Sequence, residues 1–396
     1  MENPKIRFKG YTKDWEQRKL GDVFKEYSEK NHTELSALTI IQGGGTVKRE
    51  DSDRNLMYDT SNLSNYKMVR KDDFIVHLRS FEGGLEKSSL DGIISPAYHT
   101  FHSDMADSRF YYPYFRSYEF IKHKLVSHVY GIRDGRSIDI DGMKTIEIPY
   151  TSIEEQRKIG DYLDCLDHLI TLHQRKCEQT KKLKKYMLQK MFPQNGAKVP
   201  EIRFDGFTYD WEQRKLIDYL EVSSEKNRDN RFTKEDVLSV SGEYGIVNQI
   251  EFQGRSFAGA SVSNYGVVEN GDVVYTKSPL KSNPYGIIKT NKGIPGIVST
   301  LYAVYKPKEI TDSKFVQIYF ELDSRMNSYM HPLVNKGAKN DMKVSAENAL
   351  KGMVSFPKKD EQEMISLYFS TLDNLITLHQ RQTDFYKKPN FYFISS

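Results

Sequence analysis

Two short segments of this sequence have the residue types of a catalytic or cofactor-binding loop. Ser282-Asn283-Pro284-Tyr285 is similar to the Asn/Asp-Pro-Pro-Tyr/Phe loop that holds a flipped adenine in N6-adenine methyltransferases, but it lacks the second proline. No FxGxG-type loop for a methyl donor precedes it. Gly43-Gly44-Gly45 follows the apolar run ALTIIQ, but the polar segment after it does not begin a helix, as a nucleotide-binding loop requires. We interpret the first segment as a β-turn and the second as a flexible loop.

Other catalytic and metal-binding patterns are missing from the sequence. It contains no Walker loop, no HExxH and no serine-nucleophile elbow. His168 and His173 are five residues apart, off the i, i+4 spacing with which one helix face chelates a metal. Cys165 and Cys177 lie roughly 18 Å apart along a predicted helix, too far for a disulfide. The sequence therefore predicts no catalytic residue, no metal site and no cofactor bound by this chain.

Basic and amide side chains in predicted turns are the remaining candidates for function. Arginine and lysine contact guanine edges or phosphates, and asparagine pairs with adenine through two hydrogen bonds. Taken singly, each is more simply a solvated surface residue, but two matched sets favour double-stranded DNA as the ligand. The candidate DNA-binding residues are Lys48, Arg49, Arg79, Ser80, Arg133 and Arg136 in the first half, and Lys277, Lys281, Lys336, Lys339, Asn340 and Lys343 in the second. The loops GIRDGRS and NKGAKND carry several of them at matching places.

The elements that must position these residues come from an internal duplication. PKIRFKGYTKDWEQRKL, residues 4–20, returns as PEIRFDGFTYDWEQRKL, residues 200–216, with 13 of 17 positions identical. LDHLITLHQR, residues 166–175, returns as LDNLITLHQR, residues 372–381. The period of about 200 residues is the size of a domain. Because the halves differ almost everywhere else, the pattern indicates two different binding domains on equal frames.

Each half predicts a mixed globular domain followed by a long helix. Short β-like runs such as DFIVHL, broken by turn residues and followed by helical patches, predict an α/β or α+β fold with a strongly bent sheet. From Ile153 the pattern becomes helical, with Thr151 or Ser152 as the cap and acidic residues in the first turn. The predicted boundaries are 1–150 for the first domain, 151–192 for its helix, 193–199 for a linker, 200–357 for the second domain, 358–388 for a shortened helix and 389–396 for a tail.

Both helices carry apolar residues at the alternating spacing of a coiled coil, so we expect them to pack antiparallel to each other. The seam of the first helix continues through Leu183, whereas Lys181, Lys182, Lys184 and Lys185 are assigned to its solvated face. His173 and His379 occupy equivalent seam positions, which favours packing or hydrogen bonding over acid–base work. The predicted helix-packing and partner-docking residues are Ile159, Leu166, Leu169, His173, Ile365, Leu372, Leu375 and His379.

Composition limits the class of protein but does not identify the function. The 396 residues are 38% hydrophobic, enough for two ordinary cores, and 28% charged. No apolar run approaches the roughly 20 residues of a membrane span, and the first residues lack a signal-peptide pattern. We therefore expect a cytoplasmic protein without a membrane partner. The formal net charge of +4 is only mildly basic, so the distribution of basic residues matters more than their sum.

This layout resembles the specificity (S) subunit of type I restriction–modification enzymes over nearly the whole chain. The resemblance depends on the duplicated DWEQRKL element, the helix starts IPYTSIEEQRKI and FPKKDEQEMI, and the LDxLITLHQR repeats taken together. It implies two target-recognition domains, each followed by a long helix shared between the halves. Each domain would read one half of a split, asymmetric DNA site, and the helices would set the unread spacer.

The same resemblance implies partners and cofactors for a bacterial host-defence system. Two methyltransferase (M) subunits would dock on the helices, bind S-adenosylmethionine and methylate adenine at N6, and restriction (R) subunits would add ATP- and Mg²⁺-dependent cleavage. This chain would be non-catalytic. Two alternatives stay open at this point: a coiled-coil scaffold with two protein-binding domains, and an orphan DNA methyltransferase or nuclease.

Overall fold

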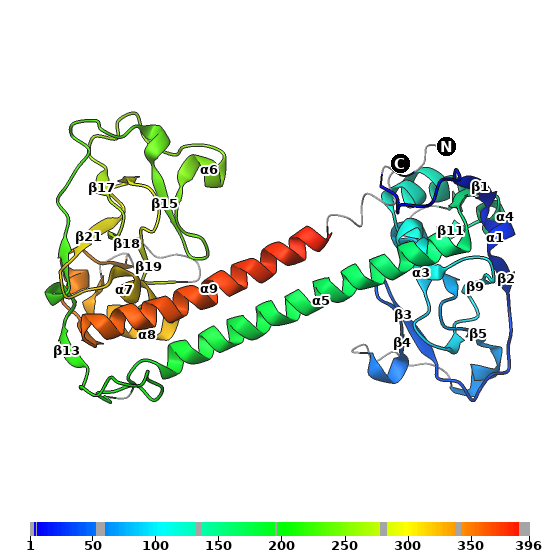
Figure 1. Ribbon diagram of the computed structural model, residues 1–396, viewed down its shortest axis with the longest axis horizontal. Coiled ribbons are helices and arrows are strands. Elements are labelled where there is room, and N and C mark those ends of the chain that lie inside the picture. The colour runs from blue at the N-terminus through cyan, green and yellow to red at the C-terminus, as the bar shows by residue number, and fades with distance from the viewer. Residues whose placement is uncertain are drawn as a thin grey trace. The chain divides into compact units, whose positions relative to one another are not determined.

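The computed structural model describes residues 4, 6–52, 60–131, 136–194, 196–277, 283–336 and 342–387 (Figure 1). The chain divides into two compact units. Unit 1 comprises Met1–Arg175 and His379–Ser396, and unit 2 comprises Lys176–Leu378. Both divisions fall inside long helices, so each unit contains the start of one long helix and the end of the other.

Unit 1 is built on a four-stranded antiparallel sheet with smaller two-stranded ladders. The sheet has the order β2 (Lys25–Tyr27), β9 (His99–His102), β6 (Phe74–Val76), β7 (Glu86–Lys87). The ladders are β1 (Glu16–Lys19) with β12 (Glu147–Tyr150), β3 (Leu38–Ile41) with β4 (Gly45–Lys48), β5 (Lys67–Val69) with β8 (Gly92–Ile94), and β10 (Val129–Tyr130) with β11 (Ser137–Ile138). The helices are α1 (Leu20–Val23), α2 (Ser80–Gly83), α3 (Ser108–Phe115), α4 (Ile140–Lys144) and the start of α5 (Ile153–Lys190).

Unit 2 repeats this plan. Its four-stranded sheet has the order β14 (Leu220–Val222), β21 (Ala303–Pro307), β18 (Val273–Tyr275), β19 (Ile288–Thr290). The ladders are β13 (Glu212–Lys215) with β24 (Met353–Phe356), β15 (Leu238–Ser241) with β16 (Gly245–Asn248), β17 (Gly266–Val268) with β20 (Gly296–Val298), and β22 (Asn335–Lys336) with β23 (Met342–Lys343). The helices are α6 (Gln249–Gln253), α7 (Ser313–Tyr319), α8 (Asp323–Met330) and the start of α9 (Lys359–Lys387). The predicted mixed fold with an internal repeat is confirmed, and the antiparallel ladders make each unit an α+β structure.

Aromatic and β-branched residues explain why these runs form strands and close a core. Strands β6 and β18 read FIV and VVY, and every residue in them is buried. In unit 1 the ring of Phe24 meets Phe74 and Tyr111 edge to face, at centroid distances of 5.3 and 5.1 Å. In unit 2 the ring of Phe192, beyond the last residue of α5, lies 5.7 Å from Phe315 and 6.0 Å from Trp211. Phe192 is therefore part of the core of unit 2.

The duplicated segment, residues 4–20 and 200–216, holds the start of each long helix in the same way. In unit 1 the guanidinium of Arg7 binds both carboxylate oxygens of Glu155, at 2.6 and 2.8 Å, and Trp15 Nε1 donates to the same carboxylate at 3.3 Å. Arg7 also donates to Lys13 O at 2.6 Å. Burial opposes the charge of Glu155, but the hydrogen bonds from Arg7 and Thr151 hold its pKa below the ordinary value.

Unit 2 contains the same arrangement at almost the same distances. Arg203 binds Glu361 at 2.7 and 2.8 Å, and Trp211 Nε1 donates to Glu361 at 3.3 Å. The next glutamine repeats as well: Gln156 Oε1 accepts the N–H of Asp107 at 3.0 Å, as Gln362 Oε1 accepts that of Asp312 at 2.9 Å. Two of the 13 identical positions, those of Arg7 and Trp15, thus anchor the helix start in the same way in both units.

The two helices meet inside each unit. In unit 1 Nδ1 of His173 lies 3.0 Å from Nδ1 of His379, and Tyr386 stacks on His173 at 5.7 Å between ring centroids. In unit 2 Cys177 Sγ lies 3.9 Å from Ile376 O, and Lys184 Nζ lies 2.6 Å from Asp373 Oδ1. Residue numbers rise along α5 while those of its partners in unit 2 fall, so the predicted antiparallel packing is confirmed there.

The predicted seam residues are buried or half-buried with one exception. Ile159, Leu166, Ile365 and Leu372 are buried, and Leu169, His173 and His379 are half-buried. Ile159 and Ile365 belong to the hydrophobic cores of their own units, and the cluster around Ile365 also contains Leu188 of α5. Leu375 is 40% exposed, so its assignment as a packing residue is wrong. Its role in partner docking stays a prediction.

A similar correction applies to the end of α5. Leu183 is 43% exposed, whereas the side chain of Lys184 is 12% exposed and lies between Glu321 and Asp373 at 2.5 and 2.6 Å. The assignment of Lys184 to the solvated face is therefore wrong. A straight α-helix has 3.6 residues per turn, so a strict seven-residue pattern drifts around it and the inner face moves from Leu183 to its neighbour.

Candidate nucleic-acid interface

The turn after strand β6 carries two of the predicted contact residues, and they have different environments. Arg79 is exposed at the start of α2. Ser80 is 0% exposed, and its hydroxyl accepts the N–H of His77 at 2.9 Å. The structure therefore contradicts the assignment of Ser80 as a surface contact. Its hydroxyl fixes the turn that presents Arg79.

Arg136 adjoins the same turn. Its guanidinium lies 3.3 Å from Glu82 Oε1 and 4.4 Å from the centroid of the Phe81 ring, and both partners belong to α2. Arg79 and Arg136 are therefore brought together around one short helix. Arg133 lies outside the described residues.

Lys48 and Arg49 lie at a different place on unit 1. Strand β4 pairs with β3 so that Lys48 faces Leu38 and Gly45 faces Ile41, which puts both basic residues at the end of the hairpin away from the glycines. Lys48 Nζ lies 3.8 Å from Glu50 Oε1. Arg49 donates to Leu38 O at 3.3 Å. The predicted contacts of the first half thus form two groups.

In unit 2 less of the predicted set can be placed. Lys277 has a left-handed backbone with φ of 49°, and its ammonium donates to Thr300 O at 2.7 Å, where burial lowers its pKa. The strands that flank the two predicted loops, β10 with β11 and β22 with β23, pair antiparallel in both units, while most of each loop lies outside the described residues. Lys281, Lys339 and Asn340, and the side chains of Lys336 and Lys343, lie outside the described part of the chain.

The glycine run Gly43-Gly44-Gly45 is an ordered hairpin turn and not the free loop that we expected. The buried carboxylate of Glu86 accepts the N–H of Gly43 at 2.7 Å and that of Gly45 at 3.2 Å. Gly43 and Gly45 have φ of 82° and 71°, a region that glycine adopts without strain. Such paired backbone N–H groups form an anion-binding concavity, and here the anion is supplied by the protein itself.

Glu86 and the two residues that complete this turn, Tyr112 and Arg116, were missed in the sequence. Tyr112 donates its hydroxyl proton to Glu86 Oε2 at 2.7 Å, and burial together with that bond raises the pKa of Tyr112 to about 12. Arg116 Nη1 donates to the Tyr112 hydroxyl at 2.9 Å, and its Nε lies 3.8 Å from Glu86 Oε1. Neither Glu86 nor Arg116 stands in a motif, so only their neighbours in space reveal them.

The equivalent position in unit 2 carries the opposite charge. Ile75 of β6 faces Glu86, and Val274 at the same place in β18 faces Lys289. Arg116 is nine residues after the helix-capping Asp107, and Glu321 is nine after Asp312, which caps α7 in the same way. Glu86 with Arg116 in unit 1 is therefore replaced by Lys289 with Glu321 in unit 2.

The pair of opposite charge in unit 2, Lys289 and Glu321, makes different contacts from the pair in unit 1. Glu321 Oε1 binds Lys184 of α5 at 2.5 Å rather than supporting a glycine turn. Burial lowers the pKa of Lys289, and Glu321 partly offsets that effect. The corresponding turn, between β15 and β16, instead exposes the ring of Tyr244, which packs on Phe252 at 5.4 Å. The two units thus differ in chemistry at these matching turns.

The segment Asn283-Pro284-Tyr285, similar in sequence to a methyltransferase loop, forms a structural turn. The N–H of Gly286 donates to Asn283 O at 3.0 Å, which confirms the β-turn, and Asn283 Nδ2 donates to Asp323 Oδ1 at 2.8 Å. Ser282 lies outside the described residues. Among the residues that the structure describes, no group of three or more His, Cys, Asp or Glu side chains could hold a metal ion. No described helix is both long and apolar enough to cross a membrane.

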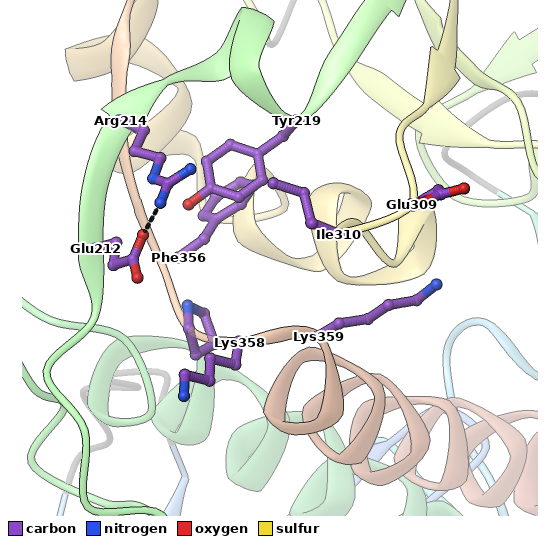
Figure 2. Close-up of a pocket in the computed structure, with 9 residues that line it drawn as sticks. Glu212, Arg214, Tyr219, Glu309, Ile310, Phe356, Lys358 and Lys359 are labelled. Atoms are coloured by element: carbon purple, nitrogen blue, oxygen red, sulfur yellow. Dashed lines mark ion pairs between the residues drawn. The ribbon is translucent and has the colours of Figure 1, made fainter.

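A cavity of about 300 Å³ lies beside the start of α9 in unit 2 (Figure 2). Its lining combines the rings of Tyr219 and Phe356, 4.6 Å apart, with the ion pair of Arg214 and Glu212. The remaining lining residues are Glu309, Ile310, Pro357, Lys358 and Lys359. In unit 1 the equivalent Arg18 stacks on Tyr150 at 3.7 Å from the ring centroid. Because the lining mixes both signs of charge, it indicates no particular ligand.

Comparisons with known proteins agree with this geometry. Residues 12–182 match the family model described as type I restriction modification DNA specificity domain. The S subunit of a type I restriction-modification system from M. genitalium has a similar fold, with a TM-score of 0.57 and 15% identity over 99% of this chain and 98% of that one. The HsdS subunit from Thermoanaerobacter tengcongensis aligns over 96% of this chain and 95% of its own, with 16% identity and a TM-score of 0.47. No curated protein sequence matches this chain.

The match of residues 12–182 to a DNA specificity domain indicates the class of DNA sequence-recognition subunits, and unit 2 repeats the plan of unit 1. The predicted resemblance is confirmed over that range: residues 12–182 carry a type I restriction modification DNA specificity domain, and the fold of the chain is similar to that of an S subunit. Subunits of this family recognise DNA and are not themselves catalytic.

Proposed function

We propose that each unit reads one half of a bipartite, asymmetric DNA site. The observation that carries this proposal is the contrast between frame and turns. The hydrogen-bond distances between Arg7 and Glu155 agree within about a tenth of an ångström with those between Arg203 and Glu361. By contrast, Glu86 in one sheet is replaced by Lys289 in the other. Equal frames with unlike turns suit two different half-sites.

In this proposal, lysine and arginine side chains first place the protein on the phosphates, which makes binding strongly salt-dependent. The exposed turns then contact base edges in the major groove. The paired helices α5 and α9 set the unread spacer between the half-sites and present docking surface to two methyltransferase (M) subunits.

The chemistry would be supplied by partner subunits. S-adenosylmethionine, ATP and Mg²⁺ would bind to the methyltransferase and restriction (R) subunits, and the assembled complex would methylate adenine at N6 and cleave unmodified DNA. A chromosomal DNA partner would place the complex in the bacterial cytoplasm. The alternatives of an orphan methyltransferase and of a scaffold without a DNA ligand lose support from the family match of residues 12–182.

The decisive experiment maps methylated adenines in a genome that expresses this chain together with its M subunits. We expect one split motif with two different specific halves and a constant gap. Exchanging residues 16–150 for those of another specificity subunit should change one half alone. A single continuous motif, or methylation without sequence preference, would contradict the proposal.

A further inference from the structure

The glycine turn of unit 1, Gly43–Gly45, contacts α2 and the end of α3, which carry basic residues on the same surface. A Cβ atom added to Gly43 would lie 2.8 Å from Arg116 Nη2, and one added to Gly83 of α2 would lie 2.0 Å from Gln42 Nε2. A Cβ on Gly84 would meet Phe115 O at 2.1 Å, beside Arg116. These close approaches show that the turn, α2 and the end of α3 pack directly against one another.

This packing gathers three arginines around a bare stretch of backbone. Arg79 directly precedes α2, Arg136 contacts Glu82 of α2, and the side chain of Arg116, which is 29% exposed, lies beside Gly43. Residues 41–44 at the turn are themselves exposed. Gly43 and Gly44 have no side chains and therefore permit close approach to a flat or grooved ligand, and adjacent guanidinium groups favour phosphates and guanine edges.

We propose that Glu86 is a positioning residue for DNA recognition: it holds the turn Gly43–Gly45 beside Arg79, Arg116 and Arg136 as the surface with which unit 1 contacts its half-site. This inference rests on the proposed half-site function. Glu86 is 0% exposed, so it touches no DNA itself and acts through the two N–H groups, Tyr112 and Arg116. Unit 2 has Lys289 at the equivalent position and uses a different device there.

If Glu86 is replaced, a purely electrostatic role and a positioning role predict opposite changes in the affinity for DNA. Removing a negative charge near DNA should strengthen binding through Coulomb attraction alone. Releasing the glycine turn, and leaving its N–H groups without their acceptor, should weaken binding to the specific site. The direction of the change therefore separates the two effects.

The test uses the complex of the full chain with its M subunits and duplexes that carry the mapped site, or that site with either half scrambled. Glu86→Ala is expected to weaken binding to the intact site by about tenfold or more. Binding to the duplex with the unit 1 half scrambled should stay equal to that of the unaltered chain. Gly43→Ala, which strains the turn without touching Glu86, should reproduce this pattern, and Glu86→Gln should fall between.

Glu34→Ala is the matched control, because it removes an exposed carboxylate of unit 1 outside this surface. It should leave binding unchanged or slightly tighter. Unchanged or tighter binding by Glu86→Ala on the intact site would overturn the inference. So would an equal loss on all duplexes, because Glu86 would then serve folding alone. If the unaltered complex ignores scrambling of either half, the proposed function itself fails, and the inference fails with it.

Discussion

Two regions of unit 1 differ in how closely unit 2 repeats them: the start of the long helix α5, and the turn Gly43–Gly45 that is held by Glu86 of strand β7. At the helix start, Arg7 and Glu155 have counterparts in unit 2 with almost the same geometry. At the turn, Glu86 has a counterpart of opposite charge. A buried ion pair that anchors a frame has few substitutes, whereas a buried charge under a recognition turn can be exchanged when the turn changes. Charge identity at buried positions therefore separates frame from reading surface.

The largest expected effect tests whether the two helix-start ion pairs, which have the same geometry, also contribute equally to the free energy of unfolding. Arg7→Ala leaves the buried carboxylate of Glu155 without its charged partner, and Arg203→Ala does the same to Glu361. Each should lower the free energy of unfolding by about 3 kcal/mol or more. Denaturant titrations followed by fluorescence of Trp15 and Trp211 would measure both.

The conservative variants Arg7→Lys and Arg203→Lys are the controls. They keep the charge and lose the two-pronged geometry, so each should cost clearly less than the alanine variant. If one frame tolerates alanine and the other does not, the equivalence of the two anchors is wrong.

The next effect tests the corrected inner face of α5. Lys184→Ala removes the partner of Glu321 and Asp373 in a half-buried site and should destabilise unit 2 by about 2–3 kcal/mol. Leu183→Ala, its exposed neighbour, should stay within about 0.5 kcal/mol. Thermal unfolding of the pair of variants decides between them. A larger loss for Leu183→Ala would restore the predicted seam.

A smaller effect sharpens the comparison of the two recognition surfaces. Arg79→Ala should weaken specific binding by about 1–3 kcal/mol if it contacts a base, and only for DNA with an intact unit 1 half-site. Lys277→Ala should affect only the other half, if at all, because its ammonium already binds Thr300 O. Filter binding or fluorescence anisotropy over a salt series would show this. An equal loss on all sequences, with a smaller salt slope, would demote Arg79 to a phosphate contact.

The duplicated parts of the fold could be predicted from the sequence, whereas the burial of individual polar side chains could not, because it depends on tertiary packing. The duplicated segments located both helix starts, and matching antiparallel strand pairs flank the two loops before the helices. Glu86 lies in the plain run GGLEKSSL, where nothing marks a carboxylate as fully buried. Lys184 sits among four lysines, a pattern typical of a solvated face, and only the nearby acids of unit 2 bury it. Ser80 looked like a turn hydroxyl open to ligand, but the fold turns it toward the backbone of His77.

The smallest expected effect concerns acid stability and again compares a buried carboxylate with an exposed one. Because the folded pKa of Glu155 is below its ordinary value of 4.5, ionisation stabilises the fold above that pH, and this contribution is lost as the pH falls through the folded value. One such group changes stability by at most about 1.4 kcal/mol per pH unit. Glu155→Gln should therefore flatten the decline in unfolding free energy between about pH 5 and pH 3, while costing stability at neutral pH. Glu154→Gln, which changes the exposed carboxylate one residue earlier, should leave that slope nearly unchanged. If both variants give the slope of the unaltered chain, the anchor at the helix start does not derive its strength from the charge of Glu155.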